Sequence, residues 1–193
     1  MVEAAISGAV SVLYSCDDKK AREIIAFDEE IDAKEREIED LCMKLLLRQQ
    51  PVAGDLRRIS VALKMITDME RIGDHAADIS EIAMMLKEAP CPEQTHLREM
   101  AIQTSTMLIS SIESYVEMNI SKAQKVIEHD DIVDDLFVSV KQELIEQMRA
   151  DPERGEMAAD LLMAAKYFER IGDHATNIAE WVIFAVTGKH ADQ

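Results

Sequence analysis

The sequence has few of the residues that build sheets and tight turns. Only 4% of its 193 residues are aromatic, and the chain holds six glycines and four prolines. Strands favour aromatic side chains, whereas turns need glycine and proline. Alanine, leucine, isoleucine, methionine, glutamate and lysine are abundant instead, which is typical of a helical protein. We therefore expect an all-α fold without a sheet.

Cysteine and long apolar runs are also scarce. Cys16, Cys42 and Cys91 are odd in number and widely separated, so they offer neither a disulfide framework nor a paired-thiol metal site. No apolar stretch approaches the roughly 20 residues that span a bilayer, and no secretory signal is present. We therefore expect a soluble protein in a reducing compartment, which is the cytoplasm.

Basic residues are outnumbered, because 21 lysines and arginines stand against 38 aspartates and glutamates and give a formal net charge of −17. A protein that binds a nucleic-acid backbone needs a basic surface, so the charge argues against nucleic acid as a partner. The surplus of carboxylates favours solubility, metal cations or basic protein surfaces as partners.

One seven-residue sequence occurs twice, as Glu70–Ala76 and, 99 positions later, as Glu169–Ala175. Both copies read Glu-Arg-Ile-Gly-Asp-His-Ala, and the likeness continues in diluted form to Asp78 and Asn177. A repeat of this length indicates a duplicated structural unit.

The repeated motif places acidic side chains on one face of a helix. With 3.6 residues per turn, Glu70 and Asp74 share a face that Asp78 continues. A glycine inside a helix costs about 1 kcal/mol relative to alanine, so a glycine beside these acids needs a reason. We expect Gly73 and Gly172 to allow the close approach of a neighbouring backbone or a bound ion.

Apolar spacing predicts six long helices. In the second of them, Ile24, Ile31, Ile38 and Leu45 recur every seven residues, which predicts a buried stripe with Leu41 on its flank. The expected helices comprise residues 2–15, 18–48, 56–87, 93–117, 121–148 and 154–187.

Proline and glycine predict where these helices end. Pro51 and Gly54 are expected to break the chain after the second helix, and Pro90 and Pro92 to separate the two halves. Gly188 is expected to cap the last helix.

The second half of the chain repeats the first. An offset of 102 aligns Asp28 and Asp32 with Asp130 and Asp134. We therefore expect two pseudo-symmetric three-helix bundles. The expected repeats are residues 1–89 and residues 93–193.

The same offset matches Met1 to Gln103. The fourth helix is expected to begin near Glu93, so about ten of its residues have no counterpart in the first repeat. We expect the first helix of the native protein to begin about ten residues before Met1.

Carboxylates spaced four residues apart occur twice in each repeat. A carboxylate in an apolar stripe, as at Asp130 and Asp134, loses several kcal/mol of hydration unless a cation compensates it, and Lys141 compensates only in part. Four converging carboxylates suit a hard cation, with Fe, Mn, Mg, Zn and Ca as candidates. The expected metal ligands are Asp28, Asp32, Glu70, Asp74, Asp130, Asp134, Glu169 and Asp173.

The basic side chains of the motif have a supporting role in this hypothesis. We expect them to pair with nearby acids rather than to bind metal directly, and a place beside the metal ligands is compatible with such pairing. These residues are Arg71, Arg170, His75 and His174.

Other interpretations of the acids were weighed. An isolated acidic pair is most often solvated surface, but the duplication favours metal. Ferritin-like di-metal oxidases place a Glu-x-x-His on two helices, and neither motif copy has that spacing. Nothing in the pattern marks either histidine as a phosphate-accepting nucleophile.

Several of these residues together resemble the PhoU family. They are the duplicated motif, the earlier Asp-x-x-x-Asp spacing, the run Gln50–Arg57 and the tail that contains Asn177. The likeness covers nearly the whole chain. It implies two three-helix bundles related by pseudo-symmetry, with metal clusters on the eight carboxylates named above.

The resemblance also implies a function. PhoU proteins are regulatory accessories of the phosphate-specific ABC transporter and are not regarded as enzymes. The resemblance implies contacts with the transporter's ATPase subunit and with a phosphate-sensing histidine kinase, which restrain phosphate uptake and phosphate-starvation genes. Membrane association is then expected only through these partners, and we also expect a homodimer.

Two other functions stay open at this point. A metal-dependent phosphohydrolase would use the carboxylates in catalysis, and an open coordination position beside a basic pocket would favour it. A PhoU-like protein could also serve a different transporter. Because Asp78 stands where the second copy has Asn177, the sequence leaves open whether both sites hold metal equally.

Overall fold

The computed structural model describes residues 1–86 and 95–189, and every regular element in these ranges is a helix, as the sequence predicts. A short 3-10 turn precedes the last helix. The elements are α1 (Val2–Ser15), α2 (Asp18–Gln49), α3 (Ala53–Met85), α4 (Thr95–Glu117), α5 (Ile120–Ala150), η1 (Pro152–Arg154) and α6 (Gly155–Thr187).

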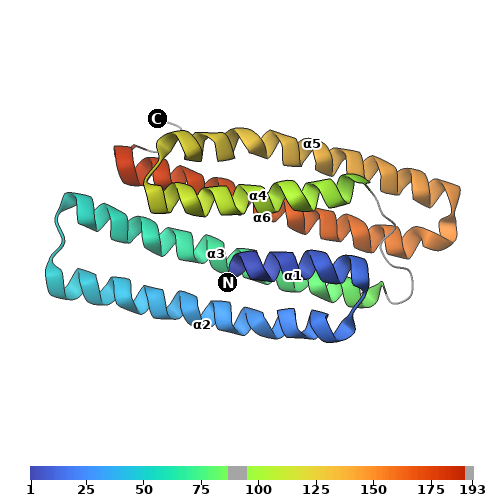
Figure 1. Ribbon diagram of the computed structural model, residues 1–193, viewed down its shortest axis with the longest axis horizontal. Coiled ribbons are helices and arrows are strands. Elements are labelled where there is room, and N and C mark those ends of the chain that lie inside the picture. Colours follow the sequence, from blue (N-terminus) through green and yellow to red (C-terminus); the bar gives the residue numbers. More distant parts are fainter. Residues whose placement is uncertain (87–94, 190–193) are drawn as a thin grey trace.

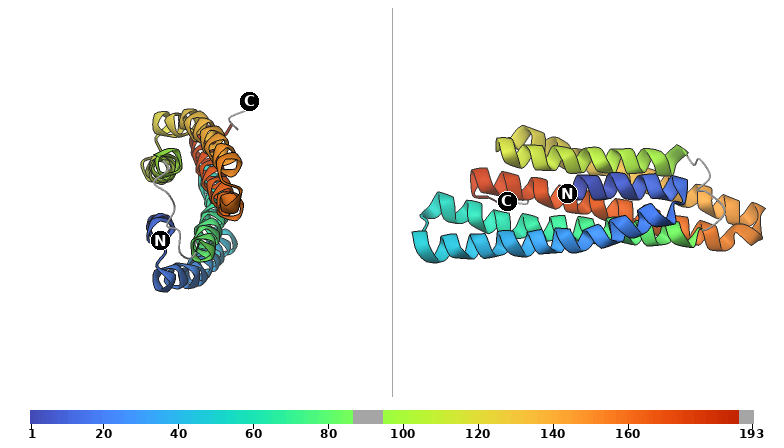
Figure 2. Two further views of the ribbon diagram at one scale, coloured as in Figure 1. Left: turned by 90° about the vertical axis from the view of Figure 1, so that its right-hand side faces the viewer. Right: turned by 60° about the horizontal axis from the view of Figure 1, so that its bottom comes forward.

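The six helices form two three-helix bundles, which pack side by side through one long helix of each. The long helices lie side by side in the order α2, α3, α6 and α5, and they make a curved layer (Figure 1). Figure 2 shows α1 and α4 on the inner side of this curve, where α1 packs on α2 and α3 and α4 packs on α5 and α6. The contact of α3 with α6 joins the bundles, so the two motif copies lie on the central pair of helices.

Local capping groups set several helix ends. The side chain of Asp17 accepts hydrogen bonds from the backbone amides of Lys19 (3.0 Å) and Lys20 (3.1 Å) and so caps the start of α2. Gly188 adopts the left-handed conformation (φ 75°), and its N–H donates to the carbonyl of Phe184. The predicted role of Gly188 as the cap of α6 is therefore confirmed.

Two details of the first hairpin differ from the prediction. Gly54 does not break the chain, because α3 begins at Ala53 and the reversal is made by Gln50 (φ 44°) and Pro51. Leu41 is not a buried flank of the stripe, since its side chain is 56% exposed near the end of α2. The long helices therefore extend beyond the packed core at this end.

Buried apolar side chains hold α3 and α6, the two helices that carry the motif, in place. Ile72, Ala76 and Ile79 are fully buried on α3, and the corresponding side chains of α6 are buried as well. Because one face of each motif helix is packed in this way, the acidic face is held in a fixed direction.

Three predicted boundaries lie outside the described residues: the break between the repeats, the end of α3 at Lys87 and the start of α4 at Glu93. The extension of the first helix before Met1 stays a prediction. Within the described ranges, no helix combines the length and the apolar character that crossing a bilayer requires.

Candidate metal centre

The first candidate site lies between α2 and α3. Asp28 and Asp32 project from α2, and Asp74 projects from α3 towards them. Each offers one carboxylate oxygen, and the three oxygens all lie within 4.8 Å of one another. Glu70, one turn before Asp74, is half-buried, and its charge acts on Asp28. The structure thus brings three of the four carboxylates predicted for the first repeat within this separation and places Glu70 near them, so a metal ion would find oxygen ligands here.

The electrostatics of this cluster call for a cation. Burial, followed by the charges of Asp74, Asp32 and Glu70, raises the pKa of Asp28 to about 6. Burial and the charge of Asp74 also raise the pKa of Glu70. Among the described residues, none donates a hydrogen bond to the buried Oδ1 atom of Asp28. A bound cation would satisfy this oxygen and remove the repulsion at the same time.

Arg71 neutralises only the outer edge of the cluster. Its Nη1 atom lies 2.8 Å from an oxygen of Asp74, and its Nε atom lies 3.4 Å from Glu70. The guanidinium is 55% exposed, so these contacts contribute little to stability. Arg71 pairs with the acids, as the sequence predicts, but it leaves the inner oxygen of Asp28 without a partner.

Gly73 explains how α2 comes so close to α3. A Cβ atom at this position would lie 2.7 Å from Oδ1 of Asp28 and 3.0 Å from Cδ1 of Ile31. At Gly172 of the second repeat, a Cβ atom would meet Asp130 at 3.4 Å and Val133 at 3.5 Å. At Gly73 the close neighbours are therefore side-chain atoms of α2, not the backbone that the sequence analysis named, whereas Gly172 has room for a methyl group.

Alanine at these two glycines should have different effects. In Gly73→Ala the new methyl group must displace the ends of the Asp28 and Ile31 side chains. This overpacking offsets the helix-propensity gain of about 1 kcal/mol, so the unfolding free energy of the metal-free protein should change little. In Gly172→Ala only the gain remains, and stability should rise by up to about 1 kcal/mol. Urea unfolding of both variants measures the difference, and equal changes would contradict the assigned role of Gly73.

The second candidate site, between α5 and α6, is more open. Asp130 and Glu169 are half-buried, whereas Asp134 and Asp173 are exposed. Burial, followed by the charges of Asp134 and Asp173, raises the pKa of Asp130 to about 6. Across residues 1–86 and 95–189, three carboxylate oxygens meet the 4.8 Å separation in the first site alone. The two sites therefore contain the same four residue types at equivalent positions, but their geometry differs.

A lysine that the sequence analysis missed lies in the second site. Lys166 forms an ion pair with Glu169, and its ammonium group lies 5.4 Å from the centre of the Phe137 ring. The first repeat has Thr67 at the equivalent position. Lys141, which was expected to compensate the acids in part, is exposed and forms no ion pair with the described residues. The second site thus contains its own cation, and its need for a metal is smaller.

The two motif histidines lie at the seam between the repeats. The rings of His75 and His174 are 5.7 Å apart. Nδ1 of His75 lies 3.3 Å from an oxygen of Asp78, and Nδ1 of His174 lies 2.9 Å from Oδ1 of Asp68. The side-chain amide of Asn177 donates to the same oxygen of Asp68 at 3.1 Å. Both imidazoles thus pair with acids, and neither belongs to the carboxylate cluster.

The seam is asymmetric because equivalent positions differ. The ring of His75 packs 5.3 Å from Tyr167, and an offset of 99 makes Tyr167 the counterpart of Asp68. Burial lowers the pKa of His75, and the hydrogen bond to Asp78 opposes this effect. Arg170 is exposed nearby and forms no ion pair within the described part of the chain. The sequence pattern around the motif gave no sign of this contact between the repeats.

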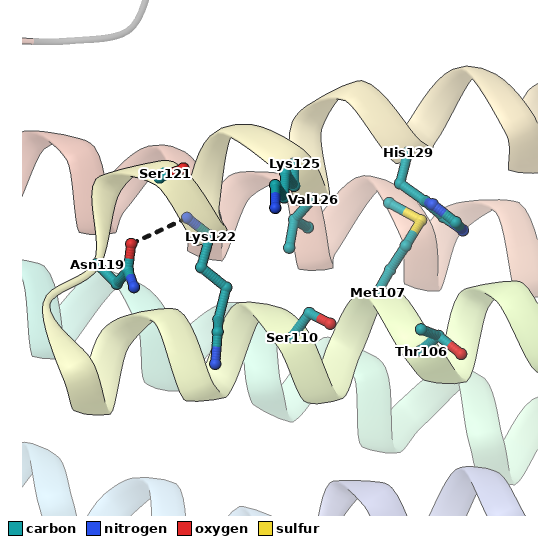
Figure 3. A pocket seen from close by; sticks show the side chains of 9 residues that line it. All are labelled: Thr106, Met107, Ser110, Asn119, Ser121, Lys122, Lys125, Val126 and His129. Carbon is teal, nitrogen blue, oxygen red and sulfur yellow. Dashed lines mark hydrogen bonds between the residues drawn. The ribbon is translucent and has the colours of Figure 1, made fainter.

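A hollow of about 370 Å³ between α4 and α5 was considered as a site for an anion (Figure 3). Lys122 projects into it but is already paired with Glu113 (2.8 Å) and Glu117 (2.9 Å). His129 is paired with Gln103. Lys125 also lines the hollow and is exposed. Two of the three basic groups of the lining are therefore occupied, which lowers the attraction of this hollow for phosphate.

The sequence and the fold are both similar to those of known proteins. The sequence model of the PhoU domain family matches residues 1–83 and 97–182. The chain belongs to the PhoU family. It is 37% identical to the "Phosphate-specific transport system accessory protein PhoU homolog" of Clostridium acetobutylicum, over 100% of this chain and 89% of the relative. It is 38% identical to the protein of the same name from Xylella fastidiosa strain 9a5c, over 96% of this chain and 79% of the relative.

Solved structures agree with this assignment. The crystal structure of PhoU from Pseudomonas aeruginosa superposes with a TM-score of 0.93 at 32% identity, and the match covers 97% of this chain and 91% of that one. The phosphate transport system regulatory protein PhoU from Streptococcus pneumoniae superposes with a TM-score of 0.90 at 28% identity, over 100% and 91% of the two chains. The tandem bundles and their relative placement are therefore those of the family.

The raised pKa of Asp28 predicts a pH dependence. The folded metal-free protein binds a proton at Asp28 more tightly than the unfolded chain, so the stability penalty is complete above about pH 6 and is relieved as the pH falls towards 3.8. Asp28→Asn lacks this penalty at every pH. The variant should therefore be more stable than the metal-free parent at neutral pH, and the difference should shrink on acidification. Thermal melts across this range test the effect, and a constant difference would contradict it.

Proposed function

We propose that this protein is a metal-binding accessory of a phosphate transport system, which lowers phosphate uptake and the expression of phosphate-starvation genes. The observation that carries the proposal is the PhoU family match across both repeats. Curated relatives at 37% and 38% identity bear the name of a phosphate-specific transport system accessory protein. The protein works by docking to the transporter's ATPase subunit and to a phosphate-sensing histidine kinase in the cytoplasm, and it acts as a homodimer.

The carboxylates have a structural role in this proposal. Asp28 and Asp32 hold one side of the ion and Glu70 and Asp74 the other, so the ion supplies the positive charge that joins α2 to α3. Oxygen donors alone suit Mg, Ca and Mn better than Zn. The more open second site, with Lys166 already present, binds metal more weakly.

The adaptor is favoured over the alternative of a metal-dependent phosphohydrolase. Phosphoryl transfer relies on several cations placed around the reacting group. Arg71 and Arg36 form ion pairs with Asp74 and Asp32 of the first cluster, and both arginine side chains are exposed to solvent. The carboxylates join two helices of a bundle and do not line the hollow of Figure 3.

Removal of the gene from its host tests the regulatory function. Deletion should raise phosphate uptake and a phosphate-starvation reporter under phosphate-rich growth, and the intact gene should restore repression. An unchanged reporter and unchanged uptake would contradict the proposal. Metal-dependent phosphatase turnover by the pure protein, abolished in Asp74→Ala, would establish the enzyme in its place.

A further inference from the structure

The two ends of the molecule differ in chemistry. We call residues 41–60, around the turn between α2 and α3, the first tip, and residues 141–160, around the turn between α5 and α6, the second tip. Figure 1 shows them at opposite ends of the long axis. Both tips occupy equivalent places in the two repeats, so each serves as a reference for the other.

The first tip is basic in a strongly acidic protein. It holds four basic residues and one acidic residue, Asp55, whereas the second tip holds three basic and six acidic residues. Lys44, Arg48 and Arg58 are exposed. None of the four basic side chains of the first tip forms an ion pair with the residues that the structure describes. The guanidinium of Arg57 lies against Gly188 at the end of α6, where a Cβ atom would meet its Nη1 at 2.7 Å. The charges of Lys44, Arg48 and Arg58 are therefore available to a partner.

The first tip also exposes aliphatic side chains. Leu47 is 78% exposed, Val52 is 75% exposed and Leu56 is 48% exposed. Leu41 and Met43 on α2 are exposed as well. In the second tip, all of which is described, no large hydrophobic side chain reaches the exposed class. The apolar and basic groups thus gather at the same end of the molecule.

This combination fits the surface of an anionic bilayer. Lysine and arginine are attracted by acidic headgroups, each strengthening binding about fivefold, while leucine and valine enter the acyl boundary. Glu39 and Asp40 on α2 are exposed beside the first tip and weaken the attraction in part. The rest of the acidic body contributes less, because charges more than a Debye length of about 8 Å away are largely screened at physiological salt. The second tip is more than one helix length away, and a helix of about 32 residues is roughly 50 Å long.

We propose that the first tip binds directly to a membrane surface that contains anionic lipids. The exposed aliphatic groups sit on a convex turn, and a bilayer accepts such a turn without a matching groove. The binding is independent of the regulatory function proposed above, and it would let the protein reach the membrane without a protein partner.

Vesicle co-sedimentation tests the proposal with the purified protein. The protein should sediment with phosphatidylcholine vesicles that contain phosphatidylglycerol, should not sediment with pure phosphatidylcholine, and should dissociate as salt is raised. The double variant Lys44→Gln/Arg48→Gln should bind about 30-fold more weakly, because it removes two basic side chains. Leu47→Ser should weaken binding by several fold through the loss of apolar contact.

The matched control removes the same number of positive charges from the second tip. Lys141→Gln/Arg149→Gln removes one lysine and one arginine from the second tip, where both are exposed, and it should bind vesicles as the parent does. Circular dichroism checks that all variants are folded. The proposal is overturned if the parent ignores anionic vesicles, or if both double variants lose binding equally. If the parent does not bind vesicles and the Lys44→Gln/Arg48→Gln variant nevertheless alters the phosphate response in cells, the first tip docks to a protein and not to a membrane.

Discussion

Manganese or magnesium added to the metal-free protein should raise its melting temperature strongly, and Asp74→Asn should remove most of this gain. An ion that binds only the folded state stabilises it by about 4 kcal/mol at a thousandfold excess over its dissociation constant. Without metal, the same substitution should raise the melting temperature, because it removes one negative charge from the cluster around the buried Asp28. The sign of the effect therefore reverses between the two forms.

Asp173→Asn provides the matched comparison at the equivalent position of the second repeat. Its effects should have the same signs and be smaller. Burial and the charge of Glu169 raise the pKa of Asp173, but Lys166, which forms an ion pair with Glu169, opposes this rise. Differential scanning calorimetry with and without a chelator measures all four states. The ligand assignment would be refuted if the chelator left the melting temperature of the parent unchanged and both substitutions stayed within about 0.5 kcal/mol, as surface changes do.

Asp68→Ala should destabilise the protein by about 2–4 kcal/mol, because it leaves two polar side chains at the seam without their acceptor. Asp68 is 13% exposed and accepts hydrogen bonds from His174 and Asn177 on the other repeat. Loss of this oxygen weakens the contact of α3 with α6, so the two bundles should lose cooperativity as well as stability.

Asp40→Ala is the control for this experiment, since it removes an exposed aspartate from α2 and should change stability by less than about 0.5 kcal/mol. Urea unfolding, followed by circular dichroism, compares both variants with the parent. Equal effects of the two substitutions would show that the seam contact contributes nothing to the joining of the repeats.

The helices and the faces of the first site could be predicted because local patterns specify them. The apolar spacing of α2, the cap at Gly188 and the four-residue spacing of Asp28 and Asp32 all act within a few turns of one helix. The duplication then fixed which helices are equivalent. Gly54 was misjudged because a glycine is tolerated in the first turn of a helix, and Pro51 with its neighbour is enough to reverse the chain.

The rest depended on contacts between distant segments. The pairing of Asp68 with His174 joins residues that are 106 positions apart, and no local period reports such a contact. Lys166 was detectable in principle, because it stands three residues before Glu169 on one helix face. The numbers of basic and acidic residues in the two tips could be counted in the sequence. Only the structure shows that the two tips lie at opposite ends of the molecule, so that one end is basic.

Elemental analysis of protein purified without a chelator tests the central claim most directly, which is that the carboxylates between α2 and α3 hold a metal ion. The parent should contain a stoichiometric amount of a metal such as Mn, Mg, Ca or Fe, and the Asp28→Asn/Asp74→Asn double variant should lose the ion of the first site while Asp40→Asn keeps it. A parent protein free of metal after such a purification, or a double variant with the full metal content of the parent, would contradict the account.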